Sequence, residues 1–109
     1  MIAIVVNLQV EGVHYWPSCN LDAVSFLMHP HRHIFYIRCE KEVKKEDREI
    51  EIITFKRLVQ EFLARRFGTP ADFGNMSCEM IAGELVRQFN LASCEVLEDG
   101  ENGAKISRL

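Results

Sequence analysis

The stretch His-Arg-His-Ile-Phe-Tyr-Ile-Arg-Cys-Glu at residues 31–40 decides the fold. Apolar and imidazole side chains alternate in it with charged or hydroxyl-bearing ones, which is the two-residue period of a half-buried strand. The odd-numbered face carries His31, His33, Phe35, Ile37 and Cys39. The segment therefore predicts a strand with one face toward a core.

Working outward, residues 4–16 show the same period on their even positions and predict an earlier strand that Pro17 ends. A loop over residues 17–30 separates the two strands. Residues 41–48 are charged and turn-like, and residues 49–53 are interpreted as a short strand extension.

Two amphipathic helices are predicted next. The first is closed by Gly68 and Pro70, and Ser77 is a good N-cap for the second. The apolar stripe of the first helix is Phe55, Leu58, Val59, Phe62 and Leu63. That of the second helix is Cys78, Ile81, Ala82, Leu85, Val86 and Phe89.

The chain closes with two predicted strands, residues 94–98 and 104–108, joined by a turn at 99–103. The order ββααββ predicts an α+β fold in two layers, with both helices on one face of a four-stranded antiparallel sheet. We expect this fold to form a single domain over residues 1–109. Small sheets leave bare edges that subunits commonly join, so a homo-oligomer is expected.

Composition excludes several classes of protein. Hydrophobic residues make up 48% and charged residues 27%, which is typical of folded globular chains. The net charge of −3 and scattered basic residues argue against nucleic-acid binding. No stretch is long enough to span a membrane, no signal peptide is recognised, and four unpatterned cysteines indicate no disulfide framework. A cytoplasmic protein is expected.

Three histidines form a candidate metal site. His31 and His33 share one strand face, and His14 lies on the apolar parity near the end of the preceding strand. Antiparallel pairing places those strand ends side by side, so three imidazoles can meet there and leave a fourth zinc position open. The alternative is a histidine pair at a wet edge or an oligomer contact, and His29 is interpreted as an outer or solvent residue.

Glu98 continues the parity of Cys94 and Val96 to the end of its strand. A carboxylate at a buried edge needs a partner, and this one suits two parallel N–H donors on a guanine-like or pterin ring. The alternative is an ordinary solvated glutamate in an acidic turn.

These residues resemble the tunnelling-fold (T-fold) family that contains 6-pyruvoyl-tetrahydropterin synthase and 6-carboxytetrahydropterin synthase. Val13-His14-Tyr15 and His31-Arg32-His33-Ile34-Phe35 are similar to the family's early His and its His-Gly-His-x-Tyr. Residues 53–58 look like the segment before its first helix, and residues 76–82 like its Pro-Thr-x-Glu-Asn-Leu-Ala cap. Glu98-Asp99 is similar to the family's Glu-Thr pair, which anchors the pterin ring.

The resemblance implies zinc on His14, His31 and His33. It also implies a pterin- or purine-like ring held at a subunit interface by Glu98, with Glu79 as a further ligand-binding position, in a hexamer or other ring assembly.

The chain also departs from this family. Leu27 stands where the family has its catalytic cysteine, and Cys19 is the nearest thiol and therefore the candidate catalytic residue. Asp72 stands alone where the family carries an Asp-His pair. Loss of base and proton relay would cost orders of magnitude in lyase rate.

Three functions stay open. The first is a zinc-dependent carbon–oxygen lyase of the tetrahydropterin synthase type with altered catalytic groups. The second is a non-catalytic binder that sequesters a nucleotide or purine-derived signal, as a phage protein could do. The third is a structural oligomer subunit whose histidines only join chains.

Overall fold

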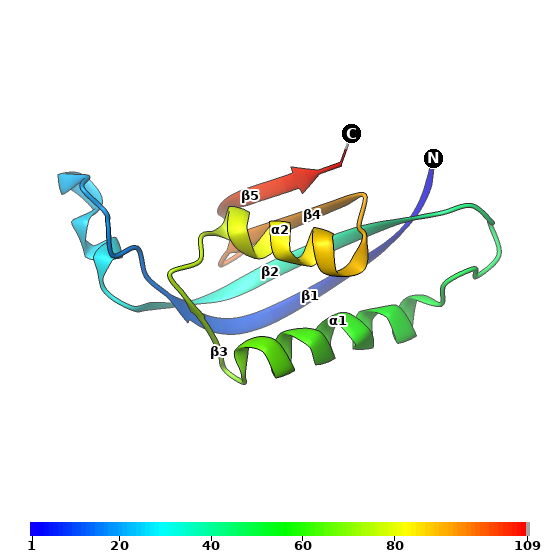
Figure 1. Cartoon of the computed structure of the whole chain (residues 1–109), viewed down its shortest axis with the longest axis horizontal. Coiled ribbons are helices and arrows are strands. Elements are labelled where there is room, and N and C mark those ends of the chain that lie inside the picture. Colours follow the sequence, from blue (N-terminus) through cyan, green and yellow to red (C-terminus); the bar gives the residue numbers. More distant parts are fainter. Residues whose placement is uncertain (109) are drawn as a thin grey trace.

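The structure, a computed structural model, describes residues 1–108 and has an α+β fold (Figure 1). In chain order the elements are β1 (Ile2–His14), the 3-10 segment η1 (Asp22–Met28), β2 (His31–Val43), α1 (Ile52–Phe67), β3 (Ala71–Gly74), α2 (Cys78–Phe89), β4 (Ser93–Glu98) and β5 (Asn102–Ser107). Among these residues no helix is long and apolar enough to cross a membrane.

The sheet has five strands in the order β3-β1-β2-β4-β5, and β3 runs parallel to β1 while the other neighbours are antiparallel. The prediction of a four-stranded antiparallel sheet was therefore wrong. Strand β3 is only four residues long, and Pro70 before it and Gly74 at its end are typical of a loop. The ring of Phe73 in β3 packs against Gly12 in β1. A Cβ added to Gly12 would lie 2.7 Å from Phe73 Cε2, so this glycine permits the close approach of β3 to β1.

Two local predictions were also wrong. Residues 49–53 form no strand extension, because the Glu51 side chain accepts hydrogen bonds from the backbone N–H groups of Ile53 (2.6 Å) and Thr54 (2.9 Å) and starts α1 there. The expected loop over residues 17–30 contains the 3-10 segment η1.

Both helices pack on one face of the sheet, as predicted. Figure 1 shows α1 running along β1 and α2 lying over β4. Ser77 caps α2 by accepting a hydrogen bond from Met80 N–H, as expected. The strand residues that face the helices are Val6, Leu8, Phe35, Ile37, Cys39, Cys94 and Val96, all buried.

The β1–β2 register fixes the position of the candidate site. His14 pairs with His31, and Gly12 pairs with His33, at the end of β1 and the start of β2. Strand β4 ends beside the same rim, because Phe35 pairs with Glu98. Three strands thus bring four ligand-bearing residues to one end of the sheet.

Candidate metal centre

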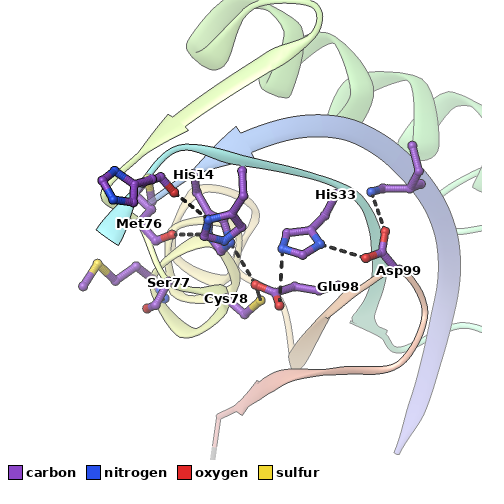
Figure 2. Close-up of polar contacts among 11 residues, drawn as sticks. His14, His33, Met76, Ser77, Cys78, Glu98 and Asp99 are labelled. Atoms are coloured by element: carbon purple, nitrogen blue, oxygen red, sulfur yellow. Dashed lines mark hydrogen bonds and ion pairs between the residues drawn. The ribbon is translucent and has the colours of Figure 1, made fainter. Parts of the chain in front are cut away.

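His14, His31, His33 and Glu98 converge at this rim, and one ligand atom of each lies within 4.8 Å of the others. The three imidazoles predicted to meet do meet, with ring centroids 4.6 to 5.4 Å apart. Figure 2 shows His14 and His33 pointing toward the carboxylate of Glu98. We call these four residues the His3Glu cluster.

Each imidazole is oriented through its Nδ1 atom. Nδ1 of His14 lies 2.9 Å from the carbonyl oxygen of Met76, and Nδ1 of His31 lies 2.8 Å from the carbonyl oxygen of His29. Nδ1 of His33 lies 2.7 Å from Oδ2 of Asp99. A carbonyl or carboxylate oxygen only accepts, so each Nδ1 carries the donated proton and each Nε2 presents a lone pair.

The three Nε2 atoms are buried, and among the described residues no hydrogen-bond donor reaches them. Buried polar atoms are normally paired, and leaving one unpaired costs about 1–3 kcal/mol. Three such acceptors at one point is an arrangement that a bound cation resolves, because imidazole nitrogen is a preferred ligand of zinc and other divalent transition metals.

Glu98 lies against two of these nitrogens. Its Oε2 lies 2.9 Å from Nε2 of His14, and its Oε1 lies 3.6 Å from Nε2 of His33. With Nδ1 as the donor, the shorter contact joins two acceptors, which is favourable only if a proton or a metal ion lies between them. Burial lowers the pKa of His14, against opposing effects of Met76 and Glu98, and so disfavours the extra proton.

The size of the His3Glu cluster is close to that of a metal site. Four ligands at about 2.0–2.1 Å around a tetrahedral zinc lie about 3.4 Å apart. The observed limit of 4.8 Å exceeds that spacing by about 1.4 Å. The four residues present could therefore hold a metal ion.

A cavity of about 400 Å³ opens next to the His3Glu cluster. Its walls include His14, His31, Glu98, Trp16, Leu27 and Glu79. That volume is within the usual range for small-molecule sites. A wider hollow of about 670 Å³ is lined by outward-facing residues of the sheet such as Gln9, Tyr36 and Arg38, and none of the cluster residues lines it.

The two nearby thiols differ in position. Cys19 is buried with its Sγ 3.7 Å from the carbonyl oxygen of Val24, and it is not among the residues that line the cavity. Cys78 does line it, and its thiol faces Oε2 of Glu98 at 3.8 Å. Burial and the Glu98 carboxylate raise the pKa of Cys78 to about 12, so this thiol stays protonated at neutral pH.

No protein-family model matches the chain, and no curated protein matches it.

Sequence reasoning missed the partners of the histidines. Asp99 was treated as a turn residue, yet its bond to His33 lowers the pKa of its carboxyl group. The exposed His29 contributes through its backbone oxygen, and no residue type signals that role. Arg32 lies on the opposite face of β2 from the His3Glu cluster, as the alternation in residues 31–40 predicts. It pairs there with Glu11.

Proposed function

We propose that this chain binds zinc through His14, His31 and His33 and holds a pterin- or purine-like ring in the adjoining cavity at a subunit interface of a T-fold assembly. The observation that carries the proposal is the convergence of three buried, unpartnered Nε2 atoms beside a carboxylate and a cavity of about 400 Å³. When bound, zinc polarises an oxygen atom of the ligand.

The ring would be held by the carboxylates of the cavity wall. Glu98 offers two oxygens and its side chain is 30% exposed, so it can accept two parallel N–H donors from a ligand. Glu79 lies in the first turn of α2 and lines the same cavity. The side chain of Trp16 supplies an apolar face on which a flat ring can stack.

Exposed apolar side chains beside the cavity support an assembly of several chains. Four large ones lie in the segment that leaves β1, namely Trp16 (41% exposed), Leu21 (52%), Phe26 (64%) and Met28 (41%). Clustered exposed apolar surface is typical of an interface. A second copy seated on this segment would bury it and complete the wall of the cavity, and sheet edges at β3 and β5 offer further contacts.

Binding without turnover is favoured over the lyase reaction. Removal of a proton from carbon needs a base whose pKa is near the working pH. Leu27 lies in the cavity wall and offers no such group, and burial and the Glu98 carboxylate raise the pKa of Cys78. The proposed main role is therefore capture of the ring, and a diverged lyase activity is the second candidate.

Native mass spectrometry of the purified chain tests the proposal, since one spectrum reports subunit number, zinc per chain and any retained small molecule. We expect a ring-sized oligomer with one zinc per chain. An oligomer or monomer that takes up no zinc would overturn the metal-dependent proposal.

Ring binding is measured separately by the fluorescence of Trp16, which is the single tryptophan and lines the cavity. Titration with neopterin and with guanosine should quench it, and Glu98→Gln should weaken the quenching affinity ten-fold or more, because one charged acceptor is lost. Glu101→Gln removes the same charge from an exposed position and is the matched control. Incubation with a dihydropterin that carries phosphate on its side chain distinguishes capture from lyase turnover, because only turnover releases the phosphate.

A further inference from the structure

Asp99 makes two side-chain contacts that tie the β4–β5 turn to the His3Glu cluster. Its Oδ2 accepts the Nδ1 proton of His33 at 2.7 Å, and its Oδ1 accepts the backbone N–H of Ile34 at 3.0 Å. The backbone N–H of Asp99 also donates to the carbonyl oxygen of Ile34 at 2.8 Å. We propose that Asp99 is a positioning residue that fixes the tautomer and direction of His33, so that Nε2 of this ring faces the metal.

The turn geometry makes this contact possible. Successive residues of a strand point to opposite faces, so Glu98 and Asp99 would not normally reach one side chain. Asp99 has a φ of +55°, a left-handed conformation that aspartate tolerates better than most residues. The chain turns there, and the two carboxylates contact opposite nitrogens of His33, as Figure 2 shows.

His33 differs in this respect from its neighbours. His14 and His31 are oriented by neutral carbonyl oxygens, whereas His33 is oriented by a carboxylate, which is a stronger acceptor. A carboxylate on the far nitrogen of a metal-binding imidazole fixes the ring and raises its basicity as a ligand. This role rests on the proposed metal site, and the tautomer of His33 can be measured without any metal.

The test compares the wild type with Asp99→Asn. Asparagine keeps the shape and tolerates the left-handed turn, but one of its two side-chain atoms is an NH2 donor, so His33 and Ile34 no longer each face an acceptor oxygen of their own. Long-range proton–nitrogen NMR of the metal-free protein, labelled at its four histidines, reads the tautomer directly. We expect His33 to be Nδ1-protonated in the wild type and mixed in Asp99→Asn, with the zinc Kd in a chelator competition raised about 10- to 100-fold.

Two further variants are measured beside Asp99→Asn. Asp99→Gly relaxes the turn and lacks the carboxylate, so it should show the same mixed tautomer and weak zinc binding. Glu101→Gln removes one charge from the same turn and should behave as the wild type. An unchanged His33 tautomer and zinc Kd in both Asp99 variants would overturn the inference. A wild type that binds no zinc would overturn the proposed function, while the NMR spectra would still decide the role of Asp99.

Discussion

Zinc should raise the melting temperature of the wild-type chain by up to about 12 °C when free zinc is 100 times its Kd. A ligand that binds only the folded state adds about 2.7 kcal/mol at that concentration. Unfolding entropy of about 2.1 cal/mol/K per residue gives about 0.23 kcal/mol/K for 109 residues, and the quotient is about 12 °C. This is an upper value, because an unfolded chain with four cysteines also binds zinc.

The change that tests this reasoning is His31→Ala. His31 is half-buried at the start of β2, so its loss removes one of the three unpartnered nitrogens while leaving the core intact. The matched control is His29→Ala, which removes an exposed imidazole whose backbone oxygen stays in place.

The assay is calorimetric melting with and without zinc. Each protein is compared with its own metal-free form. We expect the full shift in the wild type and His29→Ala, and a shift near zero in His31→Ala. Equal shifts in all three proteins would refute the idea that the converging Nε2 atoms hold the metal.

Three other substitutions test the fold. Gly103→Ala would place a Cβ 1.8 Å from the backbone oxygen of Val96, so the free energy of unfolding measured in urea should fall by about 3 kcal/mol or more. A fall of less than about 1 kcal/mol would contradict the tight β4–β5 packing. Lys41→Met removes a 2.8 Å hydrogen bond from Nζ to the carbonyl oxygen of Phe89 at the end of α2, and should lower the free energy of unfolding by about 1.5 kcal/mol in the same assay. An unchanged urea midpoint would indicate that water replaces the bond. Backbone hydrogen bonds from the first turn of α1 lower the pKa of Glu51, so its contribution is complete above the unfolded pKa and is lost as the pH falls through the folded one. The stability gap between the wild type and Glu51→Gln should therefore be widest near neutral pH and narrow below about pH 4, and a gap that widens in acid would contradict the cap.

The sequence was informative where local chemistry and packing agree. The alternation in residues 31–40 and the cap at Ser77 were enough to place β2 and α2, because each buries one clear face. Strand β3 escaped detection because four residues carry little periodicity, and only pairing with the end of β1 makes them a strand. Glu51 was misjudged because alternating isoleucines around it favour a strand, while its carboxylate starts a helix instead.

The candidate site was predictable in its histidines and not in its surroundings. Parity and antiparallel pairing bring His14 and His31 together, since both rules act on the sequence directly. Glu98 was expected to bind a ring, but the structure also places it against two imidazoles. The contact of Asp99 with His33 depends on a left-handed residue in a turn, which alternation cannot reveal.

The His3Glu cluster joins residues that lie far apart along the chain, from position 14 to position 98. If Glu98 also coordinates a metal held there, the metal would act as a cross-link that closes residues 14–98 into one loop. The described cysteines are all free thiols, so disulfides supply no comparable link among them. A cross-link that closes a loop of about 85 residues restricts the unfolded chain by up to about 4.6 kcal/mol in the entropic model. Loading the cation would then protect the N-terminal strand and the C-terminal hairpin from proteolysis as one unit.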